Sequence, residues 1–283
     1  MSATSGRDTL GTGLGPDLAR SWLLVNAADR QAYRAAETSA ADQLVLDVED
    51  AVDPRRKPQA REIATEWLQE HPAWVRVNAH GTEHWEDDVR ALAGCTGLLG
   101  VVLAKTESRA EAEETAAAFG VPVVALLESA LGVERAVDVG AAQGVVRLAF
   151  GSGDYRRDTG TAATELALAY PRSRLVVASR VSGLPGPVDG PSVSDEPVVV
   201  AEQSLAALEL GMTARLCIRP GQAAVVNETM SPSAADLRWA AEVIAEFESR
   251  DGMIRDGSDL PRLARARQLT ERAAALARGT TSP

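Results

Sequence analysis

Short apolar runs alternate with Ala/Glu/Arg-rich segments along most of this 283-residue chain, and the alternation limits the folds that it can adopt. Eight runs are rich in Val and Leu, and they begin near Ser21, Gln43, Trp74, Gly100, Pro122, Val145, Val188 and Arg215. Near-continuous apolar strands are typical of parallel sheets covered on both faces. A βα unit repeated about eight times in roughly 200 residues predicts an α/β fold, the (β/α)8 TIM barrel.

The competing arrangement is a doubly wound open sheet, which usually carries a Gly-rich phosphate loop after its first strand. The segment GTGLG at Gly11 precedes the first strand, so it does not fit that role. Residues 174–181 have the β-branched content of a strand. However, Pro171 and Gly183 bracket them and arginines recur at helical spacing, which predicts a helix there and a seventh strand after Pro185.

Three regions differ in composition. Residues 1–20 are rich in Gly, Ser and Thr and are predicted to be a flexible N-terminal tail. Residues 21–230 hold the repeating units and form the predicted TIM-barrel catalytic domain. Residues 231–283 contain two further helical patterns outside the repeat, which we interpret as a C-terminal helical extension that serves as a lid or an oligomerisation arm.

Charge and cysteine content exclude several classes of protein. The formal net charge of −11 opposes binding to phosphate backbones, so we expect no nucleic-acid partner. No apolar run approaches the roughly 18 residues of a membrane span. Cys95 and Cys217 both lie in apolar segments and cannot form a disulfide framework, which indicates reduced thiols and a cytoplasmic location.

Charged residues occur at the ends of the predicted strands, where an apolar core would not favour them. They are Asp47, Glu49, Asp50, Arg76, Glu128 and Asp154. Barrel active sites lie at the C-terminal ends of the strands, and the fifth and sixth strands of a barrel are neighbours. Glu128 and Asp154 could therefore face one cation. Two carboxylates with room for water suit Mg²⁺, with Mn²⁺ as the alternative.

Several segments together resemble a known family. LVLDVEDAVDPRRKPQAR, VRVN, VVLAKTES, ALLESALGV, FGSGDYRRDTG and CIRPGQAAVVNETMSPS follow one another as in the citrate lyase β-subunit-like (CitE-like) proteins of the HpcH/HpaI aldolase family, which includes malyl-CoA and citramalyl-CoA lyases. The resemblance runs from about residue 22 to residue 267. It implies a metal-dependent carbon–carbon lyase or aldolase that cleaves or forms a 3-hydroxy dicarboxylic acyl thioester, yielding an acyl thioester and a 2-oxo acid.

The resemblance also assigns roles to individual residues. The metal ligands fall on Glu128 and Asp154, and the substrate-binding and catalytic arginine falls on Arg76. Asp47 and Glu49, with Asp50, support metal-bound water and that arginine. The substrate is expected to be a 2-oxo acid with a thioester of CoA or of an acyl carrier.

Three further assignments follow from the resemblance. Lys105 and Arg30 fall among the substrate-binding positions. A C-terminal acid from a neighbouring subunit acts as acid/base in related lyases, and here it falls on Asp259, with Asp256 as the alternative. That role implies a homo-oligomer, a trimer or a hexamer.

Other interpretations stay open at this stage. Lys105 ends a strand where a Schiff-base lysine of a metal-free aldolase could lie. Lys57 is interpreted as a loop charge near the site mouth, and Arg172 and Arg174 either anchor a helix or meet a CoA phosphate. The loops differ from the family pattern, for example at Arg219, which stands where the CIHP motif has His. An aldolase acting on a free 2-oxo acid and an aldehyde, and a non-catalytic CitE-like subunit, are the alternative functions.

Overall fold

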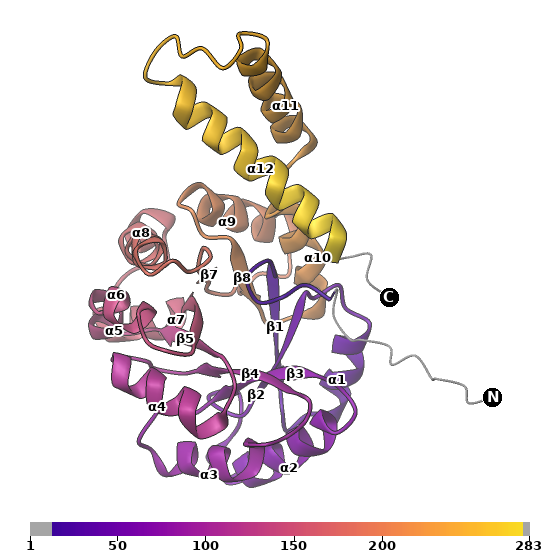
Figure 1. Cartoon of the computed structure of the whole chain (residues 1–283). Helices are drawn as coiled ribbons and strands as arrows, with labels where there is room; N and C mark the ends of the chain where they lie inside the picture. Colours follow the sequence, from indigo (N-terminus) through magenta and orange to yellow (C-terminus); the bar gives the residue numbers. More distant parts are fainter. Residues whose placement is uncertain (1–12, 280–283) are drawn as a thin grey trace, which may run out of the picture.

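The computed structural model describes residues 13–279, which form a closed barrel of eight parallel strands followed by two helices (Figure 1). Residues 1–12 of the predicted tail lie outside the described residues. The strands are β1 (Ser21–Asn26), β2 (Gln43–Asp47), β3 (Ala73–Val77), β4 (Leu98–Leu103), β5 (Val123–Leu127), β6 (Val145–Phe150), β7 (Val188–Asp189) and β8 (Ala214–Cys217).

Strand pairing closes the sheet. Each strand pairs in parallel with the next one, and β1 also pairs with β8, with Trp22 opposite Leu216. The TIM barrel predicted from the repeating pattern is therefore confirmed, and the doubly wound open sheet is excluded.

Helices cover the outside of the barrel. They are α1 (Arg30–Glu37), α2 (Lys57–Leu68), α3 (Glu83–Leu92), α4 (Arg109–Phe119), α5 (Ala130–Glu134), α6 (Ala136–Gly140), α7 (Ser152–Thr159), α8 (Glu165–Val181), α9 (Pro197–Glu209) and α10 (Pro220–Thr229), with the short 3-10 turn η1 (Pro54–Arg56) before α2. The α4 helix illustrates the local rules: Ser108 and Glu111 form a capping box at its start, and Gly120 with a φ of 68° ends it.

The ambiguous segment 174–181 is helical, as predicted, because it belongs to α8. The helix begins earlier than the sequence suggests, however, at Glu165 rather than at Pro171. Thr164 supplies the cap, since its hydroxyl accepts a hydrogen bond from the Ala167 amide. Pro171 then lies inside the helix, where it lacks the amide hydrogen of an ordinary helix residue and its ring crowds the preceding turn.

Apolar side chains form two layers. The larger cluster lies between the strands and the surrounding helices, and the smaller one fills the barrel interior. In the interior Trp22 and Trp74 contact each other edge to face, with ring centroids 5.1 Å apart. Both faces of most strands are therefore buried, which explains their continuous Val/Leu composition.

A buried arginine closes the N-terminal end of the barrel. Arg147 on β6 is fully buried and donates hydrogen bonds to the carbonyls of Pro16 and Ala19, each at 2.7 Å, and to Thr213 Oγ1 at 2.8 Å. The described part of the predicted N-terminal tail, residues 13–20, is thus held under the barrel. Sequence inspection did not single out Arg147, although it interrupts an apolar strand as Arg76 does.

Two helices, α11 (Ala234–Glu248) and α12 (Asp259–Gly279), form an antiparallel pair that projects away from the barrel (Figure 1). A small apolar cluster of Ala240, Val243 and Ala266 holds the pair together. Arg272 ties α12 to the barrel by donating to the carbonyl of Thr213 at 3.1 Å. The C-terminal helical extension predicted from sequence is present, and within the described residues no helix is long and apolar enough to cross a membrane.

Candidate active site

The predicted site residues on β2 and β3 meet because of strand register. Asp47 ends β2 and lies directly opposite Arg76 in the parallel pairing with β3. Arg76 Nε donates to Asp47 Oδ1 at 2.9 Å, and its Nη1 lies 3.4 Å from Glu49 Oε2. These two carboxylates raise the pKa of the guanidinium against the opposing effect of burial, so Arg76 stays a fixed cation in the barrel mouth.

Lys105 connects the β2 acids with the acid that follows β5. Its backbone φ is 53°, an unfavourable value for a residue with a side chain, and its amide donates to Glu128 Oε1 at 2.9 Å. Its ammonium group pairs with Glu49 and lies 3.1 Å from Asp50 Oδ2. Burial alone would lower the pKa of Lys105, but the two carboxylates raise it, which does not favour a neutral Schiff-base amine.

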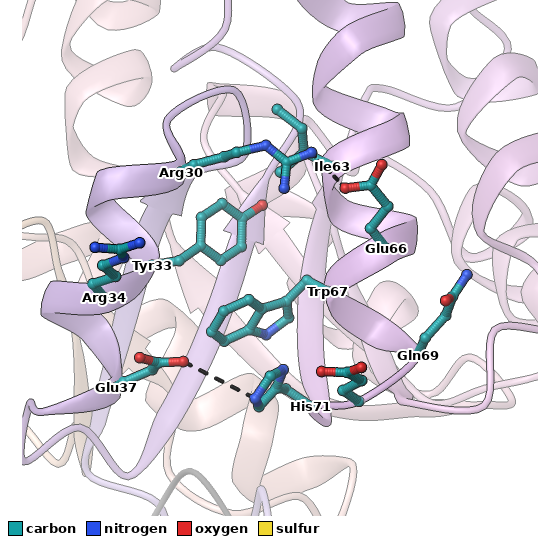
Figure 2. A pocket seen from close by; sticks show the side chains of 10 residues that line it. Arg30, Tyr33, Arg34, Glu37, Ile63, Glu66, Trp67, Gln69 and His71 are labelled. Carbon is teal, nitrogen blue, oxygen red and sulfur yellow. Dashed lines mark hydrogen bonds and ion pairs between the residues drawn. The ribbon is translucent and has the colours of Figure 1, made fainter.

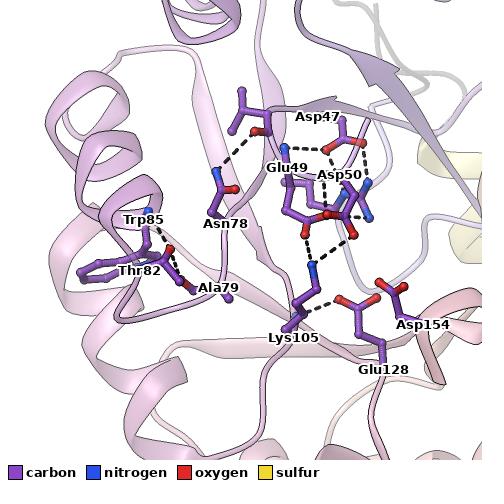
Figure 3. A network of polar contacts seen from close by, with 12 residues as sticks. Asp47, Glu49, Asp50, Asn78, Ala79, Thr82, Trp85, Lys105, Glu128 and Asp154 are labelled. Carbon is purple, nitrogen blue, oxygen red and sulfur yellow. Dashed lines mark hydrogen bonds and ion pairs between the residues drawn. The ribbon is translucent and has the colours of Figure 1, made fainter. Parts of the chain in front are cut away.

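Glu128, which directly follows β5, and Asp154, which lies in the first turn of α7 after β6, are beside each other, as Figure 3 shows. Burial raises the pKa of Glu128 to about 8; Arg76 opposes this shift, and the charges of Asp154 and Glu49 add to it. Asp154 is also within 2.9 Å of Arg157 on the solvent side of α7. Burial and the neighbouring carboxylate thus favour the protonated form of Glu128, and a cation bound between Glu128 and Asp154 would stabilise both carboxylates in their ionised form.

The donor set fits a hard divalent cation that keeps part of its water. Within residues 13–279 no group of three or more His, Cys, Asp or Glu side chains gathers to hold a metal. Glu128 and Asp154 would therefore provide two oxygen ligands, and water or substrate oxygens would complete the shell. Mg²⁺ commonly binds in this way, through one or two carboxylates, whereas structural Zn²⁺ requires four protein ligands.

Gly151 is a site residue that sequence inspection missed. A Cβ atom at this position would lie 2.2 Å from Glu128 Oε2 and 2.5 Å from Glu128 Cβ. Glycine thus leaves the space that the Glu128 carboxylate occupies. The FGSGD segment holds the signal, but its second glycine, Gly153, has no atom within 4 Å of such a Cβ, and sequence alone does not separate the two.

Lys57 has a different place from the one expected. Instead of a loop charge at the mouth, it is the first residue of α2 and is buried. Its ammonium group donates to the carbonyls of Val48 and Glu49 at 3.0 and 2.9 Å and to Asn78 Oδ1 at 2.5 Å. Lys57 therefore fixes the backbone that carries Glu49. Lys57 differs from the expectation because the chain is already helical at this position, and the start of α2 lies against the segment that follows β2.

Arg30 lies outside the carboxylate cluster. It begins α1, and its guanidinium pairs with Glu66 on α2, beside a cavity of about 480 Å³ between the two helices (Figure 2). Tyr33, Trp67 and His71 form an aromatic stack in that cavity. A substrate-binding role for Arg30 stays a prediction.

The two C-terminal acids lie at the far end of the helical pair. Asp259 accepts hydrogen bonds from the Arg255 amide at 2.7 Å and from Arg250 at 3.1 Å, and these contacts lower the pKa of its carboxyl group. Asp256 is exposed in the loop just before α12. Because α12 spans about 30 Å and its other end is fixed to the barrel, both acids lie away from the chain's own mouth (Figure 1).

Together, the fold and the cluster define a (β/α)8-barrel protein with a carboxylate pair and a half-buried arginine at its mouth. Residues 20–220 match the HpcH/HpaI aldolase/citrate lyase family, and residues 235–277 match the HpcH/HpaI aldolase C-terminal domain. The chain therefore belongs to the HpcH/HpaI aldolase/citrate lyase family and is CitE-like, which confirms the resemblance found from sequence.

Relatives support this assignment. A citrate lyase subunit beta-like protein of Mycobacterium tuberculosis is 32% identical over 240 residues, covering 82% of this chain and 86% of the relative. A (3S)-malyl-CoA thioesterase of Cereibacter sphaeroides is 30% identical over 242 residues, covering 82% and 84%. The solved structure of CitE from Mycobacterium tuberculosis with magnesium, acetoacetate and coenzyme A has a TM-score of 0.78 at 28% identity, covering 91% of this chain and 98% of that one.

Proposed function

We propose that this protein is a Mg²⁺-dependent carbon–carbon lyase that cleaves or forms a 3-hydroxy dicarboxylic acyl-CoA-type thioester of the malyl, citramalyl or citryl kind. The observation that carries the proposal is the Glu128–Asp154 carboxylate pair beside Arg76. The relative solved with magnesium, acetoacetate and coenzyme A supports the same choice of cation and substrate class. We place the reaction in the cytoplasm.

In the cleavage direction, the bond between the carbinol carbon and the thioester α-carbon breaks. The hydroxyl group releases its proton to solvent and becomes the carbonyl of the 2-oxo acid, while the bonding electrons pass to the α-carbon as an enolate. The enolate then takes up one proton, so the reaction as a whole neither consumes nor releases protons. When bound to Glu128 and Asp154, Mg²⁺, or Mn²⁺ as the alternative, supplies Lewis-acid polarisation of the substrate oxygens.

The chain's own residues supply the rest of the chemistry. Arg76, held by Asp47 and Glu49, stabilises the charge that develops on the thioester oxygen. Lys105, held by Glu49, provides a second fixed cation for a substrate carboxylate. A guanidinium that is already oriented by carboxylates needs little reorganisation when that charge appears.

The proton at the α-carbon comes, in this proposal, from a second copy of the chain. The arm formed by α11 and α12 carries Asp259 and Asp256 away from the chain's own barrel. We propose that the arm acts as a lid over a neighbouring mouth in a homo-oligomer, a trimer or a hexamer. Asp259 is the proposed acid/base and Asp256 the alternative.

Two other functions use the same pocket. An aldolase acting on a free 2-oxo acid and an aldehyde is favoured by the position of Arg30, whose side chain reaches across to Glu66 on α2 rather than into the carboxylate cluster. Thioester hydrolysis is favoured by the malyl-CoA thioesterase relatives. A non-catalytic CitE-like subunit is the alternative outside enzymes.

A substrate screen tests these functions. Malyl-, citramalyl- and citryl-CoA are incubated with the protein and Mg²⁺, with and without EDTA. The lyase releases a 2-oxo acid, detected as its phenylhydrazone, and leaves the product thioester intact. Hydrolysis instead releases a free CoA thiol. A parallel incubation uses the free aldol adduct of pyruvate and an aldehyde, without CoA. A 2-oxo acid formed only from this adduct identifies the aldolase, and no product from any substrate at saturating Mg²⁺ contradicts the enzyme proposal.

A further inference from the structure

The outer face of α8 exposes an apolar stripe. Leu166, Tyr170, Val177 and Val181 are 88, 56, 55 and 66% exposed. At 3.6 residues per turn these four positions fall within about 60° of arc. A large exposed apolar patch of this kind marks an interaction site, because single surface apolar residues are normally scattered.

The stripe is symmetric about its own centre. Leu166 and Val181 lie equally far from the midpoint between Ser173 and Arg174, and so do Tyr170 and Val177. A two-fold axis through that midpoint places Leu166 of one copy on Val181 of the other and Tyr170 on Val177. An isologous contact between two copies requires this self-complementarity.

The centre of the stripe suits close approach of two helices. Ser173 is small and half-buried and lies on the same face as the four apolar residues. Beside it, Arg174 donates to the Glu134 carbonyl at 2.9 Å, and the Tyr170 hydroxyl donates to the Glu134 carboxylate. Each copy therefore brings one cation, Arg174, and one anion, Glu134, to the centre of the contact. This local balance matters in a chain of net charge −11.

We propose that α8 forms a two-fold, antiparallel contact with α8 of a second copy of this chain. The contact is distinct from the lid function of the C-terminal arm, because it uses a different surface and leaves α11 and α12 free. In a hexamer, this contact joins the two trimers. The proposal does not depend on the proposed reaction.

The first test replaces one apolar residue of the stripe. Val177→Glu places a charge in the apolar contact, and the mass measured by light scattering after gel filtration should fall by half. Leu205→Glu on α9 is the matched control, since Leu205 is also an exposed apolar helix residue, 49% exposed. It should keep the wild-type mass. A two-fold contact pairs every chain with another, so a wild type that is a monomer or a trimer, or an unchanged mass for Val177→Glu, overturns the proposal.

The second test reports the orientation of the two helices. Ser173→Cys lies next to the two-fold axis and should form a covalent dimer under mild oxidation. Val181→Cys should not, because the antiparallel pairing separates the two copies of position 181 by about 22 Å, beyond the reach of a disulfide. The wild type, which retains Cys95 and Cys217, is the background control. Cross-linking of Val181→Cys but not of Ser173→Cys would overturn the antiparallel arrangement.

Discussion

Gly151 lies against Glu128 so closely that a methyl group on the glycine would come within 2.2 Å of Glu128 Oε2. The backbone after β6 therefore shapes the space in which the carboxylate after β5 lies. The backbone φ of Gly151 is −91°, so it is the missing side chain rather than an unusual conformation that matters here.

Gly151→Ala should displace the Glu128 carboxylate and weaken Mg²⁺ binding by at least about tenfold, which corresponds to 1.4 kcal/mol. Isothermal titration with Mg²⁺ measures the change. Gly153→Ala, two residues further along the same segment, meets no atom within 4 Å and should bind as the wild type does. Equal Mg²⁺ affinity of the two variants would show that Glu128 is not a ligand in the proposed position.

Glu128→Gln should reduce turnover at least about a hundredfold and weaken Mg²⁺ binding, because a neutral amide replaces an anionic ligand. The variant should remain folded. Burial raises the pKa of Glu128 to about 8, so above that pH the ionised side chain lowers the stability of the metal-free wild type. The neutral amide of the variant avoids this cost. At pH about 9 the melting temperature of the variant should equal or exceed that of the wild type without metal. Undiminished metal-dependent activity would contradict the metal assignment.

Mg²⁺ binding should depend on pH. In the metal-free protein the Glu128 carboxyl has a pKa of about 8 and is mostly protonated below that pH, so Mg²⁺ must displace a proton. Affinity should rise by up to about tenfold per pH unit as the pH approaches 8 and level off above it. Titrations in two buffers of different ionisation enthalpy measure the released proton. A constant affinity from acid to alkaline pH would exclude this coupling.

Borohydride reduction in the presence of pyruvate or glyoxylate should leave Lys105 unmodified. Glu49 and Asp50 raise the pKa of its ammonium group despite partial burial, so the nucleophilic amine is scarce. Intact-protein mass spectrometry reads the result directly. A mass increase that disappears in Lys105→Arg would instead identify a Schiff-base aldolase.

Lys57→Met should lower the free energy of unfolding by about 3 kcal/mol, because it leaves buried acceptors on Val48, Glu49 and Asn78 without their donor. Glu49 should also lose its fixed position, so kcat should fall more than KM rises. Urea denaturation and steady-state kinetics measure the two effects. Lys57→Arg, which keeps a cation, should recover part of both; no difference between the two variants would argue against a role for the charge.

The sequence by itself determined the strands, the closed barrel and the family, because apolar periodicity and motif order are local properties of the chain. It also marked Arg76, Glu128 and Asp154, since a charge in an apolar strand or at its end stands out. Only the tertiary structure decided what each charge contacts. Lys57 and Arg147 became buried anchors because chain segments distant in sequence supply their acceptors.

The roles of Gly151 and of the outer face of α8 also depend on tertiary contacts that the sequence pattern does not show. A glycine that makes room for a carboxylate looks identical in sequence to its neighbour Gly153, because the clash depends on a residue 23 positions earlier, Glu128. The apolar positions of α8 match those of an ordinary core helix, and only the position of α8 on the barrel leaves them facing outward. Contacts between distant segments are set by packing, which a linear pattern does not encode.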